Sequence, residues 1–148
     1  MVGSRRARRA DVAALVVFDR ICFGKRAWPA QAWREAVTEP DWTTVILAMG
    51  TAIVGVSAML LRQPEASLSS VAVHPDERRH GLGRRLVRDA IARARAAGSA
   101  WLTLEVDQAN AAAIRLYRQE RFAPVRRFRE DGQDRLEMRR RLRASSRL

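Results

Sequence analysis

The chain of 148 residues contains one cysteine, Cys22, and only two histidines. A single cysteine cannot form an internal disulfide, and it excludes a cysteine-based zinc finger. We therefore expect no bound metal. The shortage of cysteine also fits a reducing compartment, so we expect a cytoplasmic protein.

Long uncharged stretches are scarce as well, and the most notable one covers residues 42–61. Twenty residues without a charge are enough for a membrane helix. This stretch is rich in Thr, Val and Ile and has Gly50 near its midpoint, which is typical of a β-hairpin. We therefore predict strands at 43–49 and 51–62 and no membrane contact. The apolar segment near the N-terminus lacks the cleavage site of a signal peptide.

Acidic residues are outnumbered, with sixteen against twenty-eight basic ones, and the net charge is +12. Such a charge fits nucleic acid, the ribosome, an anionic cofactor or an acidic protein as a partner. Positive charge is densest at 5–9, 78–88 and 139–147, and we interpret the two terminal clusters as solvated ends. No aromatic residues alternate with the basic ones as on a base-stacking surface, so nucleic acid is not expected as a specific ligand.

The length fits one domain, residues 1–148, with a basic tail at about 141–148. Asp11 and Asn110 are predicted to cap helices, and Gly98 is predicted to end one. The fold class is therefore α/β (α+β), a mixed, mostly antiparallel central sheet flanked by helices. Beyond the hairpin, apolar periodicity predicts helices at 12–21, 30–37, 82–97 and 111–119, and strands at 68–73, 101–106, 122–129 and 134–140.

A glycine-rich turn at residues 78–84 separates a predicted strand from the helix at 82–97. Gly81 and Gly83 remove side chains where backbone N–H groups point outward at a helix start, which makes an anion site. A diphosphate is the ligand that such an anion site suits best. The spacing matches neither the dinucleotide fingerprint nor a Walker loop. The alternative is an ordinary glycine turn with solvated arginines.

The segment 71–87 resembles the acetyl-CoA signature of the GCN5-related N-acetyltransferases (GNAT), Gln/Arg-x-x-Gly-x-Gly/Ala, as Arg78-x-x-Gly81-x-Gly83. The resemblance implies the GNAT fold with acetyl-CoA as cosubstrate. It also implies that the turn backbone wraps the pyrophosphate and that the preceding strand end bonds the pantetheine arm. The implied cofactor-binding residues are Val71, Ala72, Val73, Arg78, Arg79, His80, Gly81, Leu82, Gly83 and Arg84.

A second motif at residues 105–117 resembles the bacterial ribosomal-protein alanine N-acetyltransferases, and Trp28-x-x-x-x-Trp33 resembles another segment of theirs. By position it implies that Glu105 is the general base, Asn110 a cofactor contact and Tyr117 the general acid. An α-amine with a pKa near 8 must lose a proton before it attacks the thioester, and the leaving thiolate needs one. The implied reaction is direct acetyl transfer to a protein N-terminal amine, such as that of a ribosomal protein.

Each of these residues also has a purely structural interpretation. Glu105 fits an exposed strand carboxylate, Tyr117 a core residue on a helix face, and Asn110 a helix cap alone. His74 and His80 are interpreted as loop residues. Cys22 is interpreted as a core residue rather than a nucleophile, so we expect no acyl-enzyme.

The chain departs from the resembled pattern at two informative positions. Asp107 stands where the ribosomal-protein enzymes usually have arginine. Arg121 replaces a glycine that commonly ends the helix with a positive φ, so Arg121 costs roughly 1 kcal/mol or the turn differs. These changes bear on the identity of the acceptor and leave the cofactor-binding motif intact.

Two other functions compete with acetylation of a protein N-terminus. One is an acetyltransferase of a small-molecule amine, and the other is a non-catalytic ribosome or nucleic-acid binding protein on the same scaffold. A peptide enzyme needs an open groove, which Trp28, Trp33 and Phe128 are placed to line. A cationic small molecule needs an acidic pocket, for which the candidates are Glu35, Glu39, Asp41 and Glu130.

Overall fold

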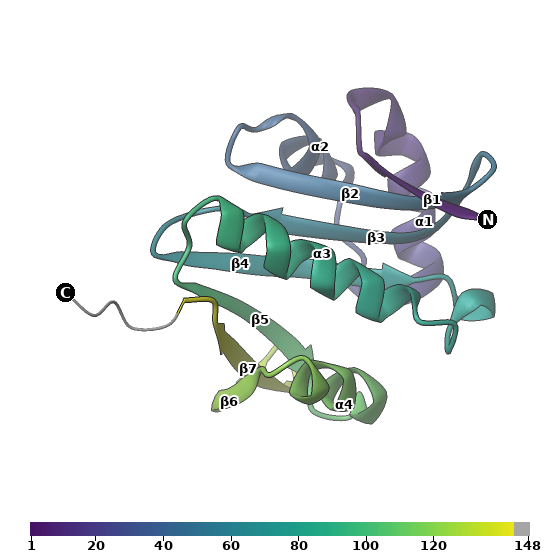
Figure 1. Ribbon diagram of the computed structural model, residues 1–148. Coiled ribbons are helices and arrows are strands. Elements are labelled where there is room, and N and C mark those ends of the chain that lie inside the picture. Colours follow the sequence, from purple (N-terminus) through teal and green to yellow (C-terminus); the bar gives the residue numbers. More distant parts are fainter. Residues whose placement is uncertain (144–148) are drawn as a thin grey trace.

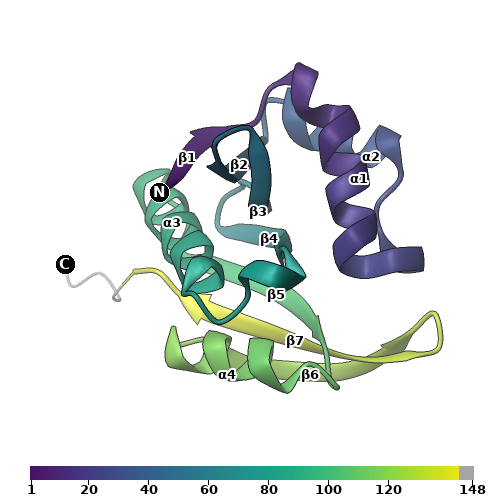
Figure 2. The same ribbon diagram turned by 90° about the vertical axis from the view of Figure 1, so that its right-hand side faces the viewer.

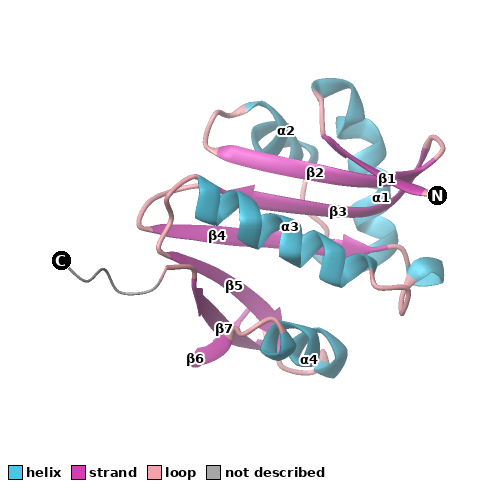
Figure 3. Cartoon of the chain, in the orientation of Figure 1, coloured by secondary structure: helices cyan, strands magenta, loops and turns pink. Residues whose placement is uncertain are grey.

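The computed structural model describes residues 1–143 as one seven-stranded sheet with helices on both faces (Figures 1 and 3). The strand order is β1-β2-β3-β4-β5-β7-β6, and only the β4–β5 pair is parallel. The predicted mixed, mostly antiparallel sheet is therefore confirmed. The strands are β1 (Val2–Arg6), β2 (Trp42–Met49), β3 (Ala52–Leu60), β4 (Glu65–Val73), β5 (Trp101–Asp107), β6 (Ala123–Glu130) and β7 (Gln133–Arg141).

The helices divide between the two faces of the sheet (Figure 2). Helices α1 and α2 pack on β2–β4 around Trp33 and Leu15, which are fully buried. Helices α3 and α4 cover the other face. The apolar stripe expected at 82–97 is buried there. The helices are α1 (Val12–Phe23), α2 (Ala30–Thr38), α3 (Leu82–Ala96) and α4 (Ala111–Gln119), with short 3-10 turns η1 (Arg9–Asp11), η2 (Gly24–Arg26) and η3 (Pro75–Glu77).

The uncharged stretch at 42–61 forms the antiparallel β2–β3 hairpin, as predicted. Its side chains are mostly buried between the two helical layers, which explains why the stretch carries no charge. Among residues 1–143, no helix is long and apolar enough to cross a membrane.

The N-terminal arginine cluster was predicted to be a solvated end, and this is wrong for its first part. Residues 2–6 form β1, which pairs with the edge of β2. Most β1 side chains are exposed, so the strand is held by backbone pairing and shows no apolar alternation. Arg5 forms an ion pair with Asp11 at 2.8 Å.

Asp11 does not cap α1 through its side chain, contrary to prediction. Its carboxylate accepts the backbone N–H of Arg8 at 2.7 Å and both Nη groups of Arg5 at 2.8 Å. The Arg5 hydrogen bonds lower the pKa of Asp11 to about 2. The residue therefore fixes the turn between β1 and α1 instead of the start of the helix.

The C-terminal arginine cluster is also not a simple solvated end. Arg139 and Arg141 belong to β7, and the Arg139 guanidinium stacks 3.6 Å from the centre of the Trp101 ring. Leu142 is buried. Residues 144–148, the rest of the predicted tail, lie outside the described residues.

Strand β4 begins at Glu65, three residues before the predicted start at 68. Residues 65–67 lie outside every strand predicted from the sequence. They pair with Trp101–Thr103 of β5, a contact between segments about 36 residues apart that local pattern cannot reveal.

Arg121 has a φ of +72°. Of the two alternatives given above, the chain therefore keeps the positive φ, which is strained for arginine, and does not adopt a different turn. We expect Arg121→Gly to raise the free energy of unfolding by about 0.5–1 kcal/mol, because glycine adopts this conformation without the Cβ clash. Arg118→Gly, inside α4, should lower it by about 1 kcal/mol. Urea denaturation of both variants checks this, and an unchanged midpoint for Arg121→Gly would contradict it.

Candidate functional site

The sheet separates between its two parallel strands. β4 and β5 are paired only over Glu65–Ser67 and Trp101–Thr103. Beyond these residues the two strands no longer pair with each other: β4 continues to Val73 beside β3, β5 continues to Asp107 beside β7, and Figure 1 shows β5 slanting away from β4. Among the described residues, the edge of β4 at 71–73 that faces β5 therefore has no strand beside it. An unpaired edge of this kind can hydrogen-bond an extended ligand.

The glycine-rich turn lies between the end of β4 and the start of α3. Gly81 has a φ of +80°, which glycine adopts readily, and it stands just before the helix. Among the described residues no side chain caps this end, and the hydrogen bond from Arg85 N to Gly81 O, at 3.1 Å, closes the first helical turn. The N–H groups of residues 82–84 precede that bond. This arrangement at the start of a fifteen-residue helix is suited to bind a phosphate group.

Gly83 marks the point where three elements meet. A Cβ at this position would lie 3.4 Å from Leu116 Cδ2 of α4 and 3.9 Å from Val73 Cγ2 of β4. The end of β4, the start of α3 and the inner face of α4 are thus neighbours. The sheet therefore brings the predicted cofactor-binding residues of β4 and of the turn to one place.

We expect Gly83→Glu to weaken acetyl-CoA binding by about tenfold or more, because it places bulk and negative charge between β4, α3 and α4. Gly83→Ala should bind nearly as well as the unchanged chain, since its Cβ makes ordinary contacts. Calorimetric titration with acetyl-CoA checks this. Equal affinities for the alanine and glutamate variants would place the binding site elsewhere.

The arginines beside the turn have different partners. Arg84 donates to Glu120 at 2.8 Å, and Arg88 bonds the same carboxylate at 3.0 Å. Glu120 is only 9% exposed, and the hydrogen bond from Arg88 and then the charges nearby lower its pKa. Arg84 therefore ties α3 to the end of α4, and its backbone N–H rather than its guanidinium is free for an anion.

Arg78 is also engaged within the protein, since its Nε donates to the carbonyl of Val73 at 3.2 Å. Arg79 is exposed, and within residues 1–143 its guanidinium has no hydrogen bond or ion pair. Of the three arginines among the implied cofactor-binding residues, Arg79 is thus the one whose side chain is free to reach a ligand.

Glu105 lies on the face of β5 opposite the core. Its neighbours Leu104 and Val106 are buried, while Glu105 is exposed. Glu137 stands across from it on β7 but is paired with Arg126 at 2.7 Å. In the described part of the chain Glu105 has no ion pair or hydrogen bond. An exposed, unpaired carboxylate beside the gap in the sheet is free to accept a proton.

Asn110 and Tyr117 both have structural roles in α4. The Asn110 side chain accepts the N–H of Ala113 at 3.1 Å, so Asn110 caps α4 as predicted. Tyr117 is 8% exposed and packs edge-on against Phe122, with ring centres 5.8 Å apart. Burial raises the pKa of Tyr117 to about 12, which keeps its phenol protonated at neutral pH. Their contact with cofactor and their catalytic role stay predictions.

Cys22 is half-buried, and its Sγ lies 3.6 Å from the carbonyl oxygen of Val73. Burial raises the pKa of this thiol to about 11, so the nucleophilic thiolate is rare at neutral pH. His74 accepts the N–H of Asp76 within its loop, and His80 is exposed in the next one. All three residues fit their structural interpretations.

Sequence reasoning missed a buried carboxylate. Asp19 of α1 is 1% exposed, and its Oδ2 accepts the N–H of Trp28 at 2.7 Å and Trp33 Nε1 at 3.1 Å. Burial raises its pKa. The available signal was an acidic residue next to Phe18 on the apolar face of the helix.

Trp33 was expected to line a peptide groove, and this is wrong because its side chain is fully buried. The large ring fills the space between α1 and the sheet instead. Trp28 remains half-buried in the α1–α2 connection, and Phe128 is half-buried on β6 under the Arg126 guanidinium, 4.3 Å from its ring centre.

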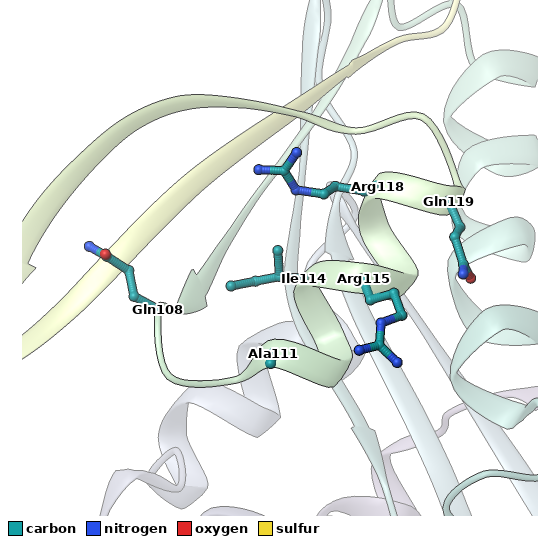
Figure 4. A pocket seen from close by; sticks show the side chains of 6 residues that line it. All are labelled: Gln108, Ala111, Ile114, Arg115, Arg118 and Gln119. Carbon is teal, nitrogen blue, oxygen red and sulfur yellow. The ribbon is translucent and has the colours of Figure 1, made fainter.

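The four carboxylates considered for an acidic pocket are all exposed, and they lie on α2, on the loop after it and at the tip of β6. A shallow hollow of about 510 Å³ lies along α4, and Figure 4 shows the side chains that line it. Its lining contains no carboxylate and no predicted site residue, but Gln119 adjoins the turn by accepting a bond from Arg84. The lining residues are Gln108, Ala111, Ile114, Arg115, Arg118 and Gln119.

Comparisons with known proteins agree with this geometry. Over 53 residues the chain is 51% identical to the [ribosomal protein bS18]-alanine N-acetyltransferase of Escherichia coli K12, a match that spans 36% of each chain. The crystal structure of the ribosomal-protein-S18-alanine N-acetyltransferase from Escherichia coli superposes with a TM-score of 0.89 at 25% identity, covering 99% of this chain and 97% of that one. Arabidopsis thaliana NAA60 in complex with acetyl-CoA gives 0.82 at 17% identity, covering 94% and 97%.

The matched segment is thus only about a third of the curated relative, whereas the structural match extends along nearly the whole chain. The family described as the acetyltransferase (GNAT) family matches residues 13–121, which include the β4–α3 turn, β5 and the whole of α4. The chain therefore belongs to the acetyltransferase (GNAT) family.

Proposed function

We propose that this protein is an acetyl-CoA-dependent N-acetyltransferase that acts on a protein N-terminal α-amine, such as that of a ribosomal protein. The observation that carries the proposal is the unpaired carboxylate of Glu105 beside the separated strands, with the uncapped start of α3 nearby. The carboxylate is suited to take a proton from an amine, and the start of α3 is suited to bind a diphosphate.

The residues around the turn fit the cofactor. The N–H groups of residues 82–84 and the guanidinium of Arg79 are suited to hold the pyrophosphate, and the free β4 edge at 71–73 is suited to hold the pantetheine arm. The Val73 carbonyl already accepts bonds from Arg78 and Cys22, so the cofactor's bonds fall to the remaining groups of this edge. When bound, acetyl-CoA supplies the acetyl thioester.

Glu105 would remove one proton from the incoming ammonium, directly or through a water, so that the free amine attacks the thioester carbon. The new N–C bond forms, and the C–S bond then breaks with its electron pair on the sulfur. The nitrogen releases its second proton to solvent, which leaves a neutral amide, and solvent returns a proton to Tyr117 after each turnover. Tyr117 would donate its phenolic hydrogen toward this sulfur. A backbone N–H near Val73 would stabilise the negative charge on the carbonyl oxygen.

An N-terminal peptide fits this site better than a cationic small molecule. A polyamine needs several converging carboxylates, and Glu35, Glu39, Asp41 and Glu130 are exposed and dispersed. The names of the curated relative and of the structural neighbour from Escherichia coli also support an N-terminal alanine of a ribosomal protein as acceptor.

The test is release of coenzyme A thiol with acetyl-CoA and two sets of acceptors. One set contains short peptides with free N-terminal alanine and other residues, and the same peptides with blocked N-termini. The other set contains polyamines and aminoglycosides. We expect turnover of the free peptides only. Turnover restricted to small amines would favour the alternative acceptor, and silence on both sets would contradict the proposal.

A further inference from the structure

A long-range ion pair joins η2 to the end of β5. Both Nη atoms of Arg26 lie 3.0–3.1 Å from Asp107 Oδ2, and the two residues are 81 positions apart. The other oxygen, Oδ1, accepts the N–H of Ala109 at 2.9 Å. We call this contact the Arg26–Asp107 strap. In Figure 2 the α1–α2 connection and the β6–β7 hairpin lie on the side of β5 away from α3 and α4.

The strap stands next to the proposed general base. Asp107 and Glu105 are two residues apart on β5 and share the face opposite the core. Their Cα atoms are therefore about 7 Å apart along the strand. Consecutive Cα atoms of an acceptor peptide are about 3.8 Å apart. With the N-terminal amine at Glu105, the side chain of the second acceptor residue comes within reach of the strap.

The strap presents positive charge to that residue. The Arg26 side chain is 42% exposed and the Asp107 side chain 25%. Both oxygens of Asp107 are engaged, whereas Arg26 directs two N–H groups at one oxygen and keeps others free. Arg135, which is opposite Asp107 on β7, adds a second cation. Of the two charged groups in the strap, the Arg26 guanidinium is therefore the one that an acceptor side chain can reach.

We propose that Arg26 is a specificity-determining residue that favours an acidic over a basic second residue in the acceptor, with Asp107 as the residue that positions it. This inference rests on the proposed N-terminal acetyltransferase function. A single charge at 5–7 Å on a partly exposed site changes kcat/KM by several-fold, up to about tenfold at low salt.

The experiment compares three peptides that differ only at the second position: Ala-Glu, Ala-Gln and Ala-Arg. For the unchanged enzyme we expect kcat/KM to fall in that order, mainly through KM, and the differences to shrink in about 1 M salt. Arg26→Gln leaves the Asp107 carboxylate as the exposed charge, so the order should reverse. Asp107→Asn removes the negative charge that offsets Arg26, so the preference for Ala-Glu should increase.

Lys25→Gln is the matched control, because it also removes one positive charge and Lys25 is an adjacent exposed cation with no ion pair in the described part of the chain. It should keep the original order and should turn over Ala-Gln at the rate of the unchanged enzyme. If the ratio of kcat/KM for Ala-Glu to that for Ala-Arg is unchanged in Arg26→Gln, this inference alone is overturned, and an equal shift of that ratio in Lys25→Gln overturns it as well. No turnover of any peptide by the unchanged enzyme overturns the proposed function and this inference with it.

Discussion

Replacing Glu105 by glutamine should lower kcat/KM for an N-terminal peptide by about 10²–10⁴-fold at neutral pH, which is the range of general-base catalysis. Glutamine keeps the size of the side chain but cannot take the ammonium proton. Glu105 is exposed and unpaired in the described residues, so the fold should lose no contact. Steady-state kinetics at saturating acetyl-CoA measure the effect.

The pH dependence separates proton removal from other roles of Glu105. A peptide α-amine has a pKa of about 8, so at pH 9 and above most acceptor is already deprotonated, and the defect of Glu105→Gln should shrink. Glu137→Gln, across from Glu105 on β7, is the control and should stay within a few-fold of the unchanged enzyme. Full activity of Glu105→Gln at pH 7 would show that Glu105 is an ordinary surface carboxylate with no role in proton removal.

Replacing Tyr117 by phenylalanine should lower kcat by about 10²-fold, with the affinity for acetyl-CoA nearly unchanged. Burial raises the pKa of Tyr117 to about 12, so the phenol keeps its proton through the working range and can donate it toward the leaving sulfur. Phenylalanine preserves the edge contact with Phe122, so the loss isolates the hydroxyl group. Single-turnover kinetics and calorimetric titration with acetyl-CoA separate the two quantities.

Phe122→Leu is the packing control for this prediction. Phe122 is 3% exposed, so the substitution should lower the melting temperature while kcat falls less than in Tyr117→Phe. If Tyr117→Phe turns over as fast as the unchanged enzyme, Tyr117 is a core residue only and another group must serve the leaving thiolate.

Features with a local cause were predictable from the sequence. The apolar stripe of α3 repeats at helical spacing because one side of that helix faces the sheet. Asn110 caps α4 through a hydrogen bond to Ala113, which is only three residues away in the sequence. Gly81 and Gly83 indicated a close approach at the start of α3, and the structure shows a positive φ at the first and neighbours from β4 and α4 at the second.

Features that depend on contacts between distant segments were not predictable. β1 has no apolar alternation because its backbone pairs with the edge of β2. Trp33 matched a motif, but burial against Leu15 and Asp19 removed it from any groove. Arg84 suited the anion site by position, yet Glu120, 36 residues away, holds its guanidinium.

The sequence by itself determined the class of sheet and the phosphate-suited turn, because short-range spacing encodes both. The two candidate catalytic residues, Glu105 and Tyr117, came from the resemblance of residues 105–117 to a family motif. Only the tertiary structure decided which charged side chains remain without an ion pair. Ion pairs form between residues that the chain brings together from far apart, and each pair removes its members from the set available to a ligand. Glu105 and Arg79 are left unpaired in residues 1–143, whereas Arg26 and Asp107 are joined across 81 positions.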